Sequence, residues 1–212
     1  MGGPLRADPP VVALYQPSPV PRPGGSNRPR LLPFEPAAEN QTNSAGKAMT
    51  EHDLSCLRRA IALASEAKAR GKHPFGALVV ANDGEVLAEA VNAFGWPDGD
   101  ATGHAELIAV REASRNFPPQ RLARATLYSS ADPCAMCAGA VYWSAISRVV
   151  YALSEERLRA MTGNHPDNPT LSLPCREVFA RGQRHIEVIG PVLEDEAAAA
   201  HVGFWTHPAP FP

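Results

Sequence analysis

The sequence predicts a single α/β domain in which helices cover both faces of a mixed five-stranded sheet, giving three layers. Helical and strand-like patterns alternate after residue 50 in the order α-β-β-α-β-α-β-β-α, which is typical of this class. The residues with the most chemistry lie where strand-like segments lead into helix starts, the usual ligand-binding edge of such sheets. A length of 212 residues and an apolar share of 44% suit one domain with an ordinary core.

The first 48 residues differ from the rest. They contain ten prolines and many Gly, Ser and Asn, with apolar residues scattered without a period. Such a stretch cannot bury enough surface to offset its ordering entropy, so we expect a disordered tail over 1–48. A Pro-rich docking segment is the alternative, and Met49 is a candidate alternative translation start. The domain is then expected over 49–205, with a short tail over 206–212.

The first half of the domain predicts one helix and a β-hairpin. Apolar residues recur at helical spacing over 51–70, and Gly71 follows as the C-cap. GALVV (76–80) and EVLAEAV (85–91) flank an Asn-Asp-Gly turn signal, which indicates a hairpin. A Gly-, Pro- and Asp-rich loop over 95–103 then leads to a helix that begins at His104.

The second half predicts three more strands and the helices between them. We expect Asp132 to be the N-cap and Pro133 the first residue of a helix that runs to about Trp143. A stretch over 154–181 predicts two short helical pieces around a Pro- and Asn-rich loop. The strands are expected over 125–130, 147–153 and 184–190, and the final helix over 194–205.

Two cysteines at a helix start predict a metal site. Cys134 and Cys137 lie one turn apart on one face, so both sulfurs can converge on one point, and the helix dipole favours a thiolate there. His104 would complete a set of three protein ligands, the number typical of a catalytic zinc. Zinc lowers the pKa of bound water and so produces a nucleophile near neutral pH. By itself, the pair of cysteines would equally fit a redox pair or helix packing.

Glu106 follows His104 by two residues and has a different predicted role. Residues two apart on a helix point roughly 200° away from each other, so the two side chains are not expected to bind one metal. A carboxylate beside the metal can instead take and deliver a proton. The combination of H-x-E with P-C-x-x-C is the signature of zinc nucleobase deaminases.

Charge and cysteine usage favour a small substrate in a reducing compartment. The first 48 residues hold five Lys or Arg and three Asp or Glu, a net of +2, and the remainder holds fifteen against nineteen, a net of −4. An acidic domain is poorly suited to a phosphate backbone. Cys56 and Cys175 suggest no disulfide framework, which favours the cytoplasm. No apolar run reaches the 18 or so residues of a membrane span, and no signal peptide is recognisable.

Three stretches resemble the cytidine deaminase-like superfamily, in particular its guanine deaminase and tRNA adenosine deaminase branch. They are HPFGALVV (73–80), HAE (104–106) and PCAMCAGAVYW (133–143), and the resemblance extends from about residue 54 to 205. The resemblance implies one zinc ion per chain on His104, Cys134 and Cys137, with Glu106 shuttling protons. It also implies a homodimer, for which the acidic, Ala-rich last helix offers one face.

The same resemblance implies which residues contact the substrate. Asn92 and Ala105 are expected to bind the base, Phe75 and Trp143 to form walls, and Trp205, beside Phe204, to cap the pocket. For Asn92 the alternative is a turn residue at the end of a strand, and for the aromatic residues it is ordinary core packing.

The chain departs from guanine deaminases after the fourth strand. Where they carry an acidic residue near a Gly-Phe-Asp segment, this sequence contains TGNHPDNP (162–169), in which Asp167 and His165 are the candidates for proton transfer. We therefore do not expect guanine to be the sole substrate, and a smaller amino-heterocycle such as cytosine, isocytosine or an aminotriazine becomes a candidate.

The leading hypothesis is hydrolytic release of ammonia from a free base or nucleoside. The alternative is tRNA adenosine-to-inosine deamination, which the net charge of −4 and the lack of a basic cluster beside the last helix disfavour. A non-catalytic zinc module would be indicated by a missing Glu or metal ligand, and none is missing.

Overall fold

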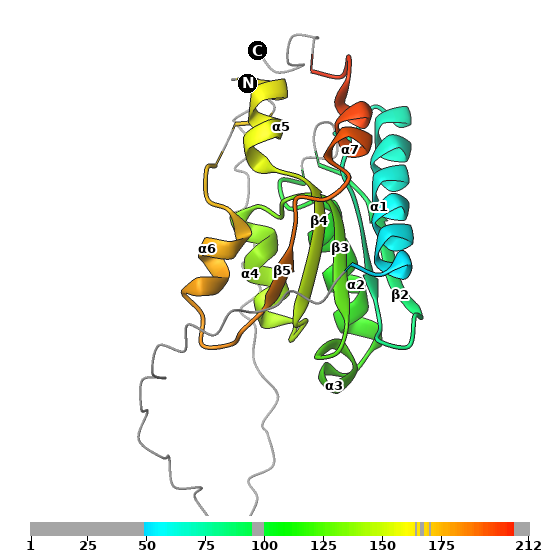
Figure 1. Ribbon diagram of the computed structural model, residues 1–212, viewed down its shortest axis with the longest axis vertical. Helices are drawn as coiled ribbons and strands as arrows, with labels where there is room; N and C mark the ends of the chain where they lie inside the picture. The colour runs from blue at the N-terminus through cyan, green and yellow to red at the C-terminus, as the bar shows by residue number, and fades with distance from the viewer. Residues whose placement is uncertain (1–48, 95–99, 164, 166–167, 170, 206–212) are drawn as a thin grey trace, which may run out of the picture. The chain divides into compact units, whose positions relative to one another are not determined.

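A computed structural model describes residues 49–94, 100–163, 165, 168–169 and 171–205 (Figure 1). The predicted tails over 1–48 and 206–212 lie outside these residues. Within them, no helix is both long enough and apolar enough to cross a membrane.

The sheet has five strands in the order β2-β1-β3-β4-β5. β1 pairs antiparallel with β2 and β3, while β3 pairs parallel with β4 and β4 parallel with β5. Helices α1 and α7 cover one face, and α2 and α4 cover the other, with α6 beside α4 (Figure 1). The predicted three-layer α/β architecture with a mixed five-stranded sheet is confirmed.

The strands and helices agree with the sequence pattern in kind and differ mainly at their ends. β5 is reduced to three residues, and α7 ends at His201 because Val202 leaves helical geometry. A short helix, α3, was not predicted. The elements are α1 Glu51–Ala69, β1 Gly76–Val80, β2 Val86–Val91, α2 Ala105–Asn116, α3 Pro119–Leu122, β3 Thr126–Ala131, α4 Ala135–Trp143, β4 Arg148–Leu153, α5 Glu155–Thr162, α6 Cys175–Ala180, β5 Glu187–Ile189 and α7 Glu194–His201.

Each face of the sheet has its own apolar core. β1 and β3 are buried along their whole length, so alternate residues of one strand serve opposite cores. Ala77 and Val79 of β1 pack toward α2 and α4, whereas Leu78 and Val80 pack toward α1. The middle strands are therefore held between two helical layers, which fixes the strand ends that carry the site.

A buried carboxylate joins α1 to the sheet. Asp53 forms a capping box with Thr50 and accepts hydrogen bonds from Tyr128 Oη at 2.7 Å and Arg148 Nη1 at 2.6 Å. Although burial opposes ionisation, these hydrogen bonds hold the pKa of Asp53 well below its usual range.

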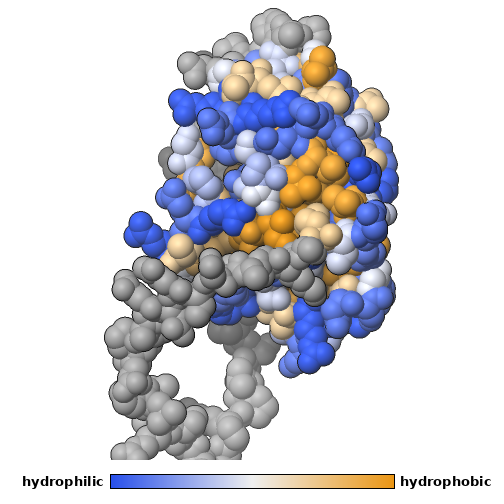
Figure 2. Space-filling view, in the orientation of Figure 1, coloured by the Kyte–Doolittle hydropathy of each residue, from blue (hydrophilic) through white to orange (hydrophobic). Residues whose placement is uncertain are grey.

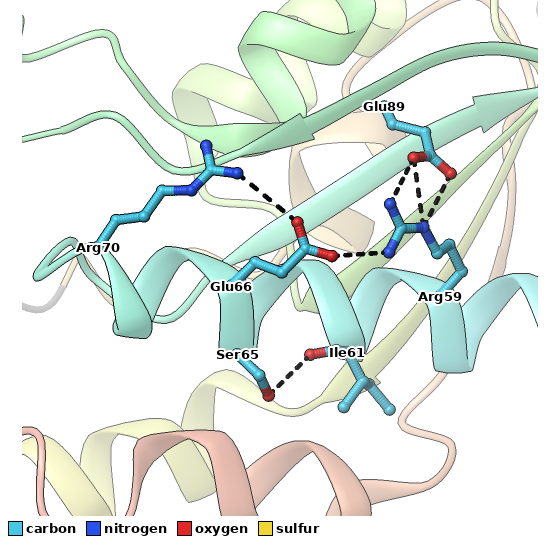
Figure 3. A network of polar contacts seen from close by, with 6 residues as sticks. All are labelled: Arg59, Ile61, Ser65, Glu66, Arg70 and Glu89. Carbon is cyan, nitrogen blue, oxygen red and sulfur yellow. Dashed lines mark hydrogen bonds and ion pairs between the residues drawn. The ribbon is translucent and has the colours of Figure 1, made fainter.

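A second, exposed network links α1 to β2. Arg59 lies between Glu66 on its own helix, at 2.8 Å, and Glu89 of β2, at 2.7 Å, and Arg70 lies near Glu66 (Figure 3). Exposed pairs of this kind contribute about 0–1 kcal/mol each, so they position α1 more than they stabilise it. On the face seen in Figure 1, hydrophilic residues border an area of hydrophobic surface (Figure 2).

Candidate active site

The site lies at one edge of the sheet, where the carboxyl ends of three strands meet. β2 and β3 are both antiparallel to β1, so β2 runs in the same direction as β3 and β4. Asn92 follows β2, Asp132 follows β3, and Glu155 lies two residues beyond β4. The chain therefore brings polar side chains from three strands to the edge where ligands bind in α/β folds.

His104, Cys134 and Cys137 form the only described group of three His, Cys, Asp or Glu side chains with metal-binding geometry. His104 is the N-cap of α2, Cys134 is the N-cap of α4, and Cys137 lies in the first turn of α4. The Nδ1 atom of His104 lies 3.5 Å from Cys134 Sγ and 3.6 Å from Cys137 Sγ.

These distances fit zinc. Ligand bonds of about 2.3 Å to sulfur and about 2.0 Å to nitrogen, at the tetrahedral angle, place the two ligand atoms about 3.6 Å apart. The donor set, two thiols and an imidazole, is also the one that zinc prefers. The three residues thus fit a zinc ion, and two of them, His104 and Cys134, line the pocket described below.

The expected start of the cysteine helix is wrong by two residues. Asp132 is not its N-cap, because its backbone N–H extends the sheet by donating to Leu153 O at 2.8 Å, and its carboxylate accepts from the Cys175 N–H at 3.3 Å. Pro133 also precedes the helix, which begins at Ala135. Cys134 consequently sits at the N-cap position rather than inside the first turn.

The thiols have unequal acidities. The hydrogen bond from Cys137, followed by that from His104, lowers the pKa of Cys134 to about 4 against the opposing effect of burial. The same hydrogen bond and burial raise the pKa of the Cys137 thiol well above its usual range. The hydrogen bond to Cys134 raises the pKa of His104 despite its burial.

Glu106 is buried beside this cluster and contacts one of its members. Its side chain is 5% exposed, Ser129 Oγ donates to its Oε1 at 2.9 Å, and the Cys137 thiol lies 3.7 Å from its Oε2. Burial raises the pKa of Glu106, which favours the proton-carrying form. Such a carboxyl group is suited to taking up and releasing a proton.

A pocket of about 270 Å³ opens above Glu106 and His104. Asn92 lies on its wall and is 2% exposed, and its Nδ2 amide group has no described hydrogen-bond partner. The other lining residues combine rings, carboxylates and apolar side chains: His73, Phe75, Phe94, Ala131, Asp132, Cys134, Met136, Glu155, Leu158, Asn168, Pro169 and Leu171.

The structure brings some of the expected substrate-binding residues to this pocket and not others. Phe75 and Asn92 line it. Trp205 packs behind the wall, with its ring centroid 5.0 Å from that of His73 and its Nε1 donating to His201 Nδ1 at 3.2 Å. Phe204, which was also expected to cap the pocket, lies behind the wall in the same way, because its ring contacts the rings of His73 and Trp205.

Trp143 and Ala105 do not line this pocket. Trp143 is 85% exposed because it ends α4 on the outer surface of the helix layer, away from the sheet edge. Ala105 is fully buried in the core between α2 and the sheet, and its side chain does not reach the pocket. His165 packs against Trp205 and does not line the pocket either, and Asp167 lies outside the described residues.

Several pocket residues escaped the sequence-based prediction, among them His73, Phe94 and Glu155. Burial lowers the pKa of His73 to about 4, so its ring is neutral. Burial and the nearby Asp132 and Cys134 raise the pKa of Glu155 to about 7. In the sequence, the only indication of a site role for Glu155 is its position two residues after the strand predicted over 147–153. For His73 the only indication is that it belongs to the 73–80 stretch.

The chain is similar in sequence to a known family and to named proteins. Residues 50–153 match the family model of the cytidine and deoxycytidylate deaminase zinc-binding region. A Schizosaccharomyces pombe protein named probable cytosine deaminase is 41% identical over 157 residues, covering 74% of this chain and 94% of the relative. The tRNA-specific adenosine deaminase of Bacillus subtilis is 32% identical over 157 residues, covering 74% of this chain and 90% of the relative.

A solved structure gives the same result for the fold. A crystal structure of a protein in complex with 2,6-diaminopurine is 25% identical, with a TM-score of 0.58, covering 74% of this chain and 83% of that chain. The chain belongs to the cytidine deaminase-like family. It is a zinc-dependent hydrolytic deaminase, with His104, Cys134 and Cys137 as the residues that can hold the metal.

Proposed function

We propose that this enzyme deaminates a small neutral amino-heterocycle, a free base or its nucleoside, and releases ammonia. One observation carries the proposal: the buried, unpartnered amide of Asn92 lines the same small pocket as Glu106 and the metal-ligand cluster. A buried amide N–H group without a partner costs about 1–3 kcal/mol, so it favours a ligand that accepts a hydrogen bond. A ring carbonyl of a base offers that acceptor.

The roles of the remaining residues follow from their positions. Zinc, when bound, supplies a nucleophile by lowering the pKa of water. Glu106 takes a proton from the attacking water and delivers it to a ring nitrogen of the substrate, then takes the proton of the resulting hydroxyl group and delivers it to the leaving amine. Ser129 Oγ holds the carboxyl group in place. Phe75 and Phe94 enclose the planar ring and exclude bulk water.

The charge of the pocket favours a neutral substrate. Among the described residues, no Lys or Arg lines it, whereas Asp132 and Glu155 do. A phosphate group would meet carboxylates there and would find no cation to bind. The net of −4 over residues 49–212, from fifteen basic and nineteen acidic residues, acts against a polynucleotide in the same way.

Deamination of tRNA adenosine is the second candidate, because the Bacillus subtilis relative that carries this name aligns over 90% of its length. A folded anticodon loop would require basic residues at the pocket, and the described residues that line it are neutral or acidic.

We also propose that the enzyme acts in a reducing compartment, the cytoplasm, as a homodimer. All four cysteines are free thiols, and two of them are metal ligands that oxidation would disable. The last helix is a poor dimer face, since Ala197, Ala198 and Ala200 are buried in the chain's own core. The exposed Trp143 on α4 is a better one.

Ammonia release from a substrate panel tests the proposal. We expect the zinc-loaded protein to deaminate at least one of guanine, guanosine, adenine, cytosine, cytidine, isocytosine and an aminotriazine. Inosine formation in an anticodon stem-loop is measured in parallel. Silence on the panel together with inosine formation would refute the proposal in favour of the second candidate.

A further inference from the structure

Glu155 is a pocket residue that the chemistry of Glu106 and the metal site does not use. It is the first residue of α5 and enters the pocket immediately after β4. Its carboxylate receives no hydrogen bond from any other residue that the structure describes. A carboxylate that lines a small pocket and receives no hydrogen bond from the protein can accept one from a donor group of the ligand.

The strand order places Glu155 across the pocket from Asn92. Asn92 follows β2 and Glu155 follows β4, and β1 and β3 lie between these strands. Three strand spacings of about 4.8 Å separate the two chain segments by about 14 Å, so the side chains approach a bound ring from opposite sides. Asn92 supplies an unpartnered amide N–H group, and Glu155 supplies an acceptor.

We propose that Glu155 is a specificity-determining residue that accepts a hydrogen bond from an N–H or O–H group of the substrate, on the side away from the acceptor atom that Asn92 binds. This inference rests on the proposed function and narrows it. The preferred substrate presents an acceptor on one edge and, besides the reacting amine, a donor on the opposite edge. The donor is a ring N–H, a second amino group or a sugar hydroxyl.

Asp132 strengthens this selection. It lines the pocket beside Glu155, and one of its oxygens is already engaged by the Cys175 N–H. In their ionised forms the two carboxylates together disfavour substrates that present only acceptors on this edge, because an acceptor facing an acceptor leaves both without a partner.

Matched substrate pairs test the inference. The pair 2,6-diaminopurine and adenine differs by an amino group, and cytosine and 1-methylcytosine differ by a ring N–H, while cytidine adds the sugar hydroxyls. For each member that the wild-type enzyme deaminates, kcat and KM are measured for wild type, Glu155→Leu and Glu155→Gln. Glu156→Leu is the matched control, since Glu156 is the next residue on α5 and is exposed.

The wild-type enzyme should prefer a donor-bearing substrate, and Glu155→Leu should lose that preference by about 10-fold in kcat/KM, mainly through KM, because one hydrogen bond is removed. Glu155→Gln, which keeps an acceptor oxygen, should retain part of the preference for the donor-bearing substrate. Glu156→Leu should retain the whole preference. The substrate pair in which the preference is lost identifies the donor. Zinc content and melting temperature show whether each variant is folded.

Two results would overturn the inference and leave the proposed function intact. One is an unchanged preference in Glu155→Leu, and the other is an equal loss for every substrate, including those without the donor. A wild-type enzyme that deaminates nothing in the panel, while binding zinc, would instead refute the proposed function and the inference with it.

Discussion

Replacing Glu106 with Gln separates proton transfer from every other role of this side chain. Glu106 is 5% exposed and accepts a hydrogen bond from Ser129 Oγ at 2.9 Å. Gln has the same size, and its amide oxygen can accept that bond, so the fold and the metal ligands should remain. The amide cannot exchange a proton near neutral pH, so only the acid–base function is removed.

The expected loss is about 10²- to 10⁴-fold in kcat, the usual contribution of general acid–base catalysis, which corresponds to about 3–5 kcal/mol. Ammonia release measures the loss, and metal analysis should show an unchanged zinc content. Glu112→Gln provides the control, because Glu112 lies on the same helix with its side chain 41% exposed. Activity within tenfold of wild type in Glu106→Gln would refute the assigned role.

Three further predictions concern the metal, the pH dependence of stability and the packing of α1 on β1. Cys134→Ser should lose stoichiometric zinc and melt at a lower temperature, as measured by metal analysis and calorimetry; full zinc retention would contradict the ligand assignment. Burial lowers the pKa of His201 from 6.5 to about 4. The contribution of its neutral ring to the stability of the fold is therefore complete above about pH 6.5 and is lost as the pH falls toward 4. The unfolding free energy of the wild type should therefore fall by about 3 kcal/mol between pH 7 and 4 on account of His201, and His201→Gln should lack this decrease. His52→Gln, at an exposed histidine, should keep it. Urea titrations at several pH values measure the decrease, and the same pH dependence of unfolding free energy in all three proteins would exclude this effect. Gly76→Ala should cost about 3 kcal/mol or more, because a Cβ there would lie 2.4 Å from Leu63 Cβ, and a melting temperature within about 2 °C of wild type would disprove the packing argument.

Most of the fold could be predicted because the hydrophobic pattern and the turn signals agree. The strand over 76–80 has the predicted bounds, since Gly76 and the Asn-Asp-Gly turn delimit it. The cysteine helix begins two residues later than predicted, because Asp132 continues the sheet instead of capping the helix. Its backbone N–H donates to Leu153 O. That partner comes from another strand, and local capping preferences carry no information about it.

The metal site could be predicted from spacing, whereas the pocket walls could not. Cys134 and Cys137 are one helical turn apart in any structure that forms this helix, so their convergence is a local property. The ring contact between His73 and Trp205 joins residues more than a hundred positions apart, and only the finished fold creates it. Trp143 shows the opposite case, since an aromatic residue inside a recognised motif lies on the outer surface.

The charge of the pocket connects the metal to the choice of substrate. Glu106, Asp132, Glu155 and the two thiols surround a small volume in which the described lining residues include no Lys or Arg. Burying several acidic groups together is unfavourable unless they take up protons or bind a cation, and the raised pKa values of Glu106, Asp132 and Glu155 reflect this. A divalent cation on the thiols offsets part of that negative charge but leaves the Asp132 and Glu155 side acidic. A neutral ring with donors on that side complements what remains, and an anion does not. The electrostatics that favour the metal therefore also favour an uncharged heterocycle over a nucleotide.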